Sequence, residues 1–260
     1  MTNLSNPSNL SNPSTTVGSA DVQHKARYVL GIECSNPSAL EGGAGEVGLG
    51  RLIDDRGEET DQKIEFLESH ALSSEARGSD GLMVAIDQLC LSNSVEPSQI
   101  ERVAVSVGPG GYTALRVSVT VAKVLGMSIG CGVVAVPSAA VAAVNLLAWK
   151  ADVDAVIALA SKNGQSHCTR LVDGALEVLG VMDSHAVSVC GSRVLVGDSH
   201  LPKQMIEACA GTGMEVRGLE LSARSCLEAS AGYEVMGPER LGPLYAREPD
   251  AVTQWRALHG

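Results

Sequence analysis

The sequence predicts an α/β fold made of two successive halves, each opening with three strands and continuing with helices and strands in alternation. Glycine-containing turns separate the strand-length apolar runs that open each half, and helix-period patterns follow both sets. The 260 residues are 45% hydrophobic but only 3% aromatic. Such a core is filled by Val, Leu, Ile and Ala, which suits helices packed on a sheet. We expect subdomains over residues 27–150 and 151–250.

Both ends of the chain are predicted to lie outside these subdomains, as tails over residues 1–26 and 251–260. The hexapeptide Asn-Leu-Ser-Asn-Pro-Ser fills residues 3–8 and is repeated at residues 9–14. Polar, proline-punctuated sequence cannot bury enough apolar surface to offset its ordering entropy, so the first tail is predicted to be disordered. It also lacks the basic-then-apolar pattern of a signal peptide, which favours a cytoplasmic protein.

The first half is predicted to follow the order βββαβαβα. Its first strand is a continuous apolar run of the kind that is buried on both faces. On its first helix Leu82, Ile86 and Leu89 recur at i, i+4 and i+7, which places them on one face. The predicted strands are residues 28–32, 47–52, 64–67, 103–107 and 133–136, and the predicted helices are residues 81–91, 113–129 and 137–149.

The second half repeats this pattern in a weaker form. Asn163-Gly164 and Asp173-Gly174 are the residue pairs that two-residue hairpin turns favour, so we expect them to join three consecutive strands. Pro202 is suited to the first turn of a helix. The predicted strands are residues 156–159, 168–172, 176–179 and 194–196, and the predicted helices are residues 202–210 and 221–233.

Charge and cysteine usage exclude several classes of function. The formal net charge is −11, so the chain lacks the cationic surface that unaided binding to nucleic acid or to an anionic membrane requires. The seven cysteines include no Cys-x-x-Cys pair and the six histidines are dispersed, which predicts neither a disulfide framework nor a metal site. These features are typical of a protein from a reducing cytoplasm.

The most informative segment lies between the predicted strand at 103–107 and the helix at 113–129. Glycines at such a junction let the backbone approach a ligand, and the amides at the start of the helix can bind an anion. The segment has neither the Walker Lys-Ser/Thr nor the order of a dinucleotide-binding loop. A phosphate contact and a tight structural turn both remain open for its candidate residues Gly108, Pro109, Gly110, Gly111, Tyr112, Thr113 and Arg116.

The helix after this loop carries an apolar surface wider than a surface helix needs. Thr113, Arg116, Thr120 and Lys123 share one stripe, and nearly all remaining positions are apolar. Such a helix is either deeply buried or packs a second face against a partner, and both alternatives remain open. With the helix at 81–91 it predicts a partner interface formed by Leu82, Ile86, Leu89, Val117, Val121, Val124 and Leu125.

Two other groups of residues are candidate sites. Cys34 follows Glu33, and His167 precedes Cys168, but neighbours on a strand point to opposite faces, so His167 is not expected to activate Cys168. Arg240, Arg247 and Arg256 surround Tyr245 and Trp255 near the C-terminus. A contact with tRNA or nucleotide is one reading of this segment, and a solvated tail folded onto the domain is the favoured one.

Several motifs resemble those of the TsaB family. Residues 105–123, with Gly-Pro-Gly, an aromatic residue, Thr and Leu-Arg before a long apolar helix, are similar to the family's GPGSFTGLR signature. Residues 28–34 resemble its opening strand, Lys162-Asn163-Gly164-Gln165 its R-x-G-E turn, and residues 243–247 its closing P-x-Y-x-R. Order and spacing agree over residues 27–250.

The resemblance implies an actin-like/Hsp70-type (ASKHA) fold of duplicated βββαβα subdomains. It also implies a non-catalytic partner of TsaD in making threonylcarbamoyladenosine at position 37 of ANN-decoding tRNAs. Such a subunit binds and stabilises TsaD, helps to recruit TsaE, and meets tRNA only through the complex. It has no cofactor of its own, with ATP or ADP at the junction of the complex left open. The alternatives are a homodimeric binding protein of this fold and a degenerate ATP-dependent kinase or ATPase.

The sequence departs from the family pattern at several positions. Glu33-Cys34 stands in place of Asp-Thr, Gly111 in place of Ser, Ala114 in place of Gly, and Ala160 in place of Asp. The changes at Glu33 and Ala160 fall where active kinases and ATPases of this fold keep carboxylates for metal and nucleotide. The helix at 137–149 also lacks the His-x-x-x-His metal motif of TsaD. These departures favour a protein that is not an enzyme on its own.

Overall fold

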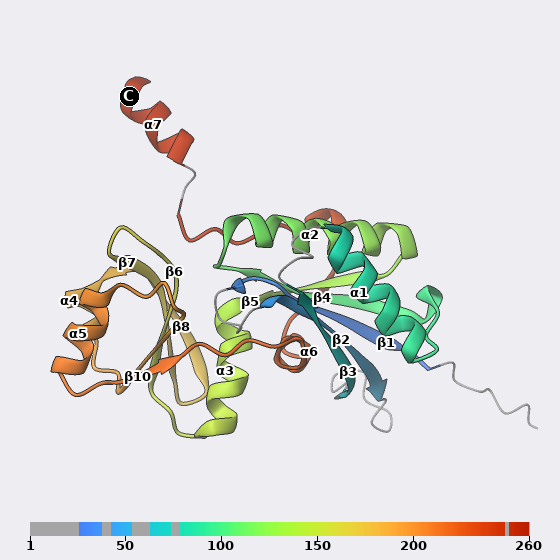
Figure 1. Ribbon diagram of the computed structural model, residues 1–260, viewed down its shortest axis with the longest axis horizontal. Helices are drawn as coiled ribbons and strands as arrows, with labels where there is room; N and C mark the ends of the chain where they lie inside the picture. The colour runs from blue at the N-terminus through green and yellow to red at the C-terminus, as the bar shows by residue number, and fades with distance from the viewer. Residues whose placement is uncertain (1–25, 38–42, 54–62, 74–78, 248–249, 260) are drawn as a thin grey trace, which may run out of the picture.

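The computed structural model describes residues 26–37, 43–53, 63–73, 79–247 and 250–259, and it contains two α/β lobes joined by two crossings of the chain (Figure 1). The disordered tail predicted at 1–26 lies almost wholly outside these residues. The segment predicted as a tail at 251–260 instead contains helix α7 (Asp250–His259), which stands apart from both lobes (Figure 1).

The first lobe is built on a six-stranded mixed sheet in the order β11-β5-β4-β1-β2-β3. Strands β1 and β2 are antiparallel, whereas β4 runs parallel to β1 and β5 runs parallel to β4. The strands are β1 (Tyr28–Glu33), β2 (Gly43–Ile53), β3 (Lys63–Ser73), β4 (Ile100–Gly108), β5 (Gly132–Pro137) and β11 (Val235–Met236).

The second lobe has a five-stranded sheet in the order β10-β9-β6-β7-β8. Both predicted hairpin turns are confirmed, since φ is positive at Asn163, Gly164, Asp173 and Gly174. The strands are β6 (Ala155–Lys162), β7 (Gln165–Val172), β8 (Ala175–Asp183), β9 (Val194–Gly197) and β10 (Glu215–Gly218). Strand β10 was not among the predicted strands.

The two sheets repeat one topology, which confirms the duplicated α/β fold of the actin-like class. The order β3-β2-β1-β4-β5 in the first lobe corresponds strand for strand to β8-β7-β6-β9-β10 in the second. In both, the first strand pairs antiparallel with the second and parallel with the fourth. The helices are α1 (Ser79–Ser92), α2 (Tyr112–Ile129), α3 (Ser138–Trp149), α4 (Ser184–Ser188), α5 (Lys203–Gly211) and α6 (Ala223–Ser230).

The second predicted subdomain, residues 151–250, is wrong at its C-terminal end, because the chain returns there to the first lobe. Helix α6 packs on β1 and β2, and β11 pairs with β5. The return depends on close packing, since a Cβ at Gly31 would lie 2.7 Å from Leu227 Cγ. Helix α3 contacts β4 and β5 of the first sheet and β6 of the second, and it also packs on α6, so α3 and α6 lie at the crossings between the lobes.

The core is aliphatic, as the composition predicted. Its large fully buried side chains, among them Leu30, Leu49, Ile157 and Leu195, are Leu and Ile with one Met. No helix in the described part of the chain is both long enough and apolar enough to cross a membrane.

Candidate functional site

The loop at Gly108–Gly111 joins β4 to α2 through a crowded space, which explains two of its three glycines. Gly108 has φ +108°, and a Cβ there would lie 2.6 Å from the Leu244 carbonyl oxygen. A Cβ at Gly110 would lie 2.0 Å from the Ser35 carbonyl oxygen. The nearest atom to a Cβ at Gly111 is 3.6 Å away, so a larger residue fits there. The peptide bond between Gly108 and Pro109 is cis.

The segment that follows β1 holds this loop by hydrogen bonding. The Gly111 amide donates a hydrogen bond to the Ser35 carbonyl at 2.8 Å. Ser35 is itself held by Glu33, whose Oε1 accepts from the Ser35 amide at 2.8 Å and from its hydroxyl at 2.6 Å. Glu33, which departs from the family pattern, therefore positions the loop indirectly, because its carboxyl group holds Ser35 and Ser35 binds Gly111.

Glu33 is enclosed, with 1% of its surface exposed, and its Oε2 has no hydrogen-bond partner. Burial raises the pKa of Glu33, and the hydrogen bonds from Ser35 oppose that shift only in part. Burial thus disfavours the charged form of this carboxyl. Among the described residues, no group of three or more His, Cys, Asp or Glu side chains could hold a metal ion.

Tyr112 and Arg116, at the start of α2, lie on the surface beside the C-terminal segment. The ring of Tyr112 is 55% exposed and stacks on the ring of Tyr245, with centroids 5.3 Å apart and planes inclined by 29°. The Arg116 guanidinium lies 5.4 Å from the centroid of the Tyr112 ring and donates to its hydroxyl at 3.3 Å. Thr113 is exposed next to them. The predicted loop residues thus come together, and Tyr245 joins them.

The three C-terminal arginines, by contrast, have different surroundings. Arg247 donates hydrogen bonds to backbone carbonyls of the β6–β7 hairpin. Arg240 lies 3.6 Å from Glu234, and Arg256 is on α7. Trp255 stacks on His259 of its own helix, with centroids 5.0 Å apart. The predicted fold-back onto the domain is therefore right for Tyr245 and Arg247 and wrong for Trp255 and Arg256, which lie on α7 apart from both lobes. The arginines do not form one anion site.

Most of the predicted partner interface is core, which corrects that prediction. Leu82, Ile86 and Leu89 are 1%, 5% and 0% exposed, and Val121 is 8% exposed. They pack in one cluster with side chains of β1, β2 and β4, because the apolar stripe at i, i+4 and i+7 faces their own sheet. Val117 and Leu125 are half-buried against the same cluster. Val124 alone of the seven predicted residues is exposed, at 54%.

Other apolar side chains on the same two helices are exposed and were not predicted as interface residues. They lie off the stripes that meet the sheet, and this is the signal that could have identified them. On α1 they are Met83, Val84 and Leu91, and on α2 Met127 joins Val124. Helices α1 and α2 contact each other on the first lobe, where α2 runs along the top of the view and α1 slants down from it (Figure 1). We call these five residues the α1–α2 patch.

The structure offers the buried cysteines no role as nucleophiles. Burial raises the pKa of the Cys168 thiol to about 12, and burial also raises that of Cys34 to about 12, with Glu33 adding to the effect. His167 lies next to Cys168 on β7, and burial lowers its pKa. Thiols held in the neutral form at physiological pH are poor nucleophiles.

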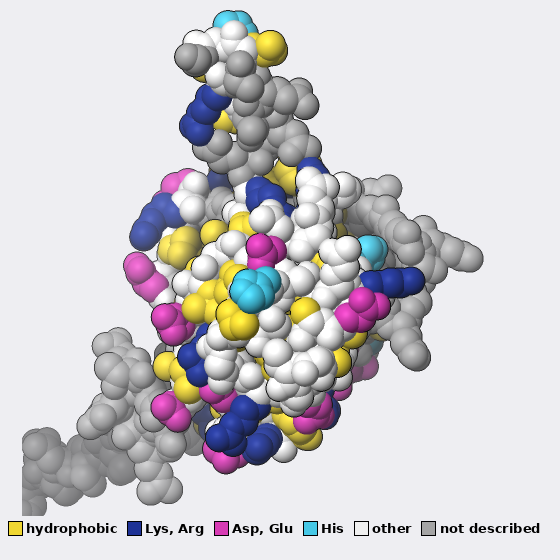
Figure 2. Space-filling view, turned by 90° about the vertical axis from the view of Figure 1, so that its left-hand side faces the viewer, with side chains coloured by type: hydrophobic (Ala, Val, Ile, Leu, Met, Phe, Trp, Pro, Cys, Tyr) yellow, Lys and Arg dark blue, Asp and Glu magenta, His cyan; other side chains and the backbone are white. Residues whose placement is uncertain are grey.

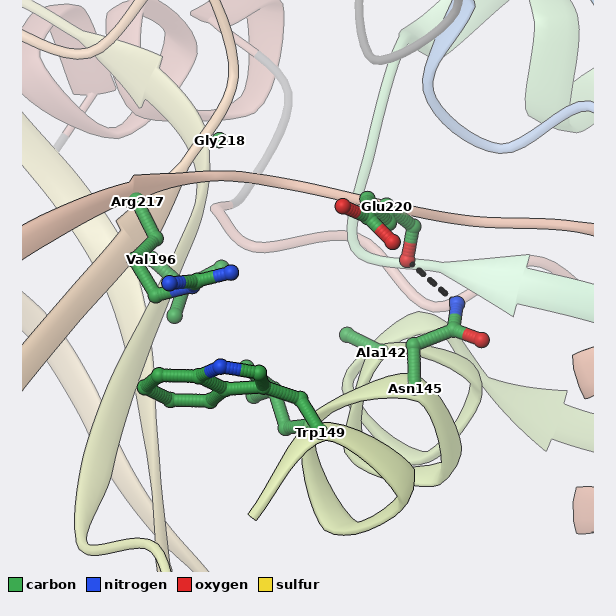
Figure 3. A pocket seen from close by; sticks show the side chains of 8 residues that line it. Ala142, Asn145, Trp149, Val196, Arg217, Gly218 and Glu220 are labelled. Carbon is green, nitrogen blue, oxygen red and sulfur yellow. Dashed lines mark hydrogen bonds between the residues drawn. The ribbon is translucent and has the colours of Figure 1, made fainter.

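A small pocket lies between α3 and β10, at the crossings (Figure 3). The Arg217 guanidinium stacks over the Trp149 ring at 3.8 Å. The Asn145 side chain donates to the Glu220 carbonyl at 2.9 Å and accepts from the Ser225 hydroxyl at 2.7 Å. The cavity volume is about 20 Å³, room for one water molecule, so its residues serve to join the crossings.

The visible surface of the second lobe carries basic and acidic side chains side by side (Figure 2). Figure 2 views this lobe from outside, and the described Lys and Arg side chains on it have Asp and Glu neighbours. The Arg170 guanidinium pairs with Asp154 at 3.0 and 2.7 Å, and it lowers the pKa of that carboxyl. This mixed surface agrees with the net charge of −11.

Comparison with known proteins identifies relatives of the whole architecture. Residues 74–215, more than half of the chain, match the family model described as TsaD: tRNA N6-adenosine threonylcarbamoyltransferase. No curated protein matches the sequence. The solved structure of YeaZ from Pseudomonas aeruginosa is similar at a TM-score of 0.60 and 17% identity, covering 84% of this chain and 99% of that one.

A second solved structure gives nearly the same result. It is described as an uncharacterized protein with similarity to peptidase YeaZ from Pseudomonas aeruginosa, and it is similar at a TM-score of 0.59 and 16% identity. The likeness covers 85% of this chain and 100% of that one. At these identities the likeness concerns the fold, and it confirms the fold class that the sequence predicted.

Proposed function

The chain belongs to the TsaD family, and from this membership we propose that it acts as a TsaB-type subunit in the synthesis of threonylcarbamoyladenosine on tRNA. In this role it performs no bond chemistry. It binds and stabilises TsaD in the cytoplasm, helps to recruit TsaE, and leaves contact with tRNA to the complex.

The observation that carries the non-catalytic role is the state of the loop at Gly108–Gly111. In an enzyme of this fold we would expect carboxylates facing an open cleft at this loop. Here Glu33 is buried and holds Ser35, and Ala160 offers no carboxylate on the facing hairpin. Protein backbone occupies the space on both sides of the loop, since the carbonyls of Leu244 and Ser35 lie against Gly108 and Gly110. These contacts support a structural role for the loop.

The α1–α2 patch supports the proposed partner contact. Val84, Val124 and Met127 are 55%, 54% and 65% exposed, and Leu91 is 70% exposed. Exposed apolar side chains on two helices that contact each other are what a helical partner can cover. The Lys123 ammonium on α2 donates hydrogen bonds to the backbone carbonyls of Glu239 and Leu241, so its charge is not free to oppose an apolar contact at the patch.

The test is co-purification of this chain with TsaD of the same organism, followed by titration calorimetry. We expect a stable complex in which Val124→Asp weakens binding and an exposed substitution on the second lobe, Glu177→Lys, does not. Self-association without affinity for TsaD would favour the homodimer. ATP turnover by the chain alone would favour the kinase or ATPase. Either result would overturn the proposal.

A further inference from the structure

We propose that residues 238–247, here called the strap, tie the two lobes together and fix their relative orientation, so that this chain works as one rigid body. Two-lobed α/β proteins joined only at their crossings can open and close about that hinge. The strap adds a third connection. In Figure 1 it passes above the gap between the lobes, whereas α3 and α6 connect them below.

On the first lobe the strap is held along α2 and β4. The Lys123 ammonium donates to the carbonyls of Glu239 and Leu241, at 3.0 and 3.4 Å. Leu241 is 4% exposed and packs in the core cluster of the first lobe. The Leu244 amide donates to the Val107 carbonyl at 2.7 Å, at the end of β4. These contacts fix the backbone of the strap before it leaves this lobe.

At the gap the strap is held by an aromatic contact. The Tyr245 ring stacks on Tyr112, and the carbonyl of the preceding residue, Leu244, closes over Gly108. The stacked pair joins the strap to the first turn of α2, which begins at Tyr112. Stacked aromatic pairs stabilise a contact beyond the area that they bury.

On the second lobe the Arg247 side chain makes the connection. Its guanidinium donates to the carbonyls of Ala160, Lys162 and Gln165, at 2.9, 3.3 and 3.2 Å. All three carbonyls belong to the β6–β7 hairpin. The register of the hairpin shifts between Leu159 and Lys162, and Ala160 has φ +51°, an uncommon conformation for alanine. Hydrogen bonds from a charged guanidinium favour this irregular backbone, and they are stronger than neutral ones.

The arrangement makes Arg247 the positioning residue for the lobes. Its acceptors Ala160, Lys162 and Gln165 lie 87, 85 and 82 positions earlier in the sequence. Lysine would keep the charge but not the planar fork that serves three acceptors at once. The inference concerns lobe motion and does not depend on the proposed partner.

The test is NMR on the deuterated full chain, with residual dipolar couplings measured in each lobe. In the wild type we expect one alignment tensor to fit both lobes. In Arg247→Ala we expect two tensors of different magnitude, and exchange of the Leu244 amide that is about tenfold faster or more. Arg256→Ala, on α7, is the matched control and is expected to behave as the wild type.

Tyr245→Ala is the second variant, in case Arg247→Ala does not fold. It removes the stacking contact and leaves the guanidinium contacts in place, so it is expected to raise Leu244 exchange by a smaller factor than Arg247→Ala. Two different tensors in the wild type would overturn the proposal. So would a single tensor in folded Arg247→Ala with unchanged Leu244 exchange.

Discussion

Two valines on α2 should respond to the same substitution in opposite ways. Val121 is 8% exposed and packs in the core of the first lobe, whereas Val124, three residues later, is 54% exposed. We predict that Val121→Asp prevents stable folding and that Val124→Asp leaves the fold intact but disrupts binding to TsaD. The pair separates the core face of α2 from its partner face.

The magnitudes follow from burial. Val121→Asp loses the transfer free energy of a buried valine, about 1.5–3 kcal/mol. It also buries a carboxylate without a partner, which costs several kcal/mol more. The sum exceeds about 4 kcal/mol, a large part of the roughly 5–15 kcal/mol that stabilises a typical domain. Val124→Asp changes an exposed helix position, where the expected change is within about 0.5 kcal/mol.

Urea unfolding followed by circular dichroism gives the stability of each variant, and titration calorimetry with TsaD gives its affinity. For Val124→Asp, loss of an apolar contact with TsaD is expected to cost about 2 kcal/mol, or about a 30-fold weaker Kd. Val121→Asp as stable as the wild type would refute the assignment of that face to the core. Wild-type affinity in folded Val124→Asp would refute the α1–α2 patch as the contact.

Three further predictions concern the loop and its surroundings. Gly110→Ala should lose about 1–3 kcal/mol of unfolding free energy in urea, because its Cβ would lie 2.0 Å from the Ser35 carbonyl oxygen. Gly111→Ala should lose less than about 0.5 kcal/mol, because the atom nearest to its Cβ is 3.6 Å away. Equal losses in the two variants would contradict this. Ala160→Gly should gain about 0.5–1 kcal/mol in the same assay, since relief of the left-handed conformation outweighs the added freedom of the unfolded chain; a loss would show that the alanine is not strained. Because the pKa of Glu33 is raised on folding, its protonated carboxyl stabilises the folded state. This contribution to the unfolding free energy is fully present below the unfolded pKa of 4.5, and it is lost as pH rises through the folded pKa. Glu33→Gln should remove this fall, so a wild-type slope of unfolding free energy against pH in the variant would argue against it.

The sequence predicted the duplicated fold because its signals are local. Hairpin pairs such as Asn163-Gly164 and the change from strand to helix periodicity mark each element where it occurs. The return of α6 to the first lobe has no such signal. Its apolar residues, such as Leu227, would fit either sheet, and the choice depends on the space above Gly31, which is far away in sequence.

The candidate site was predicted in part for the same reason. The Gly108–Gly111 loop is a local motif, and the structure places its residues together with Tyr245. An apolar stripe such as Leu82, Ile86 and Leu89 shows that a helix has a buried face, but not whether its own sheet or a partner covers it. Burial in three dimensions decides that question.

The measurement that tests the central claim most directly is reconstituted transfer of threonylcarbamoyl to tRNA. TsaD and TsaE of the same organism are assayed with and without this chain, and this chain is also assayed alone. The account predicts transfer only when TsaD and this chain are both present, and none with this chain alone. Transfer by this chain alone, or a rate with TsaD and TsaE that this chain does not change, would contradict it.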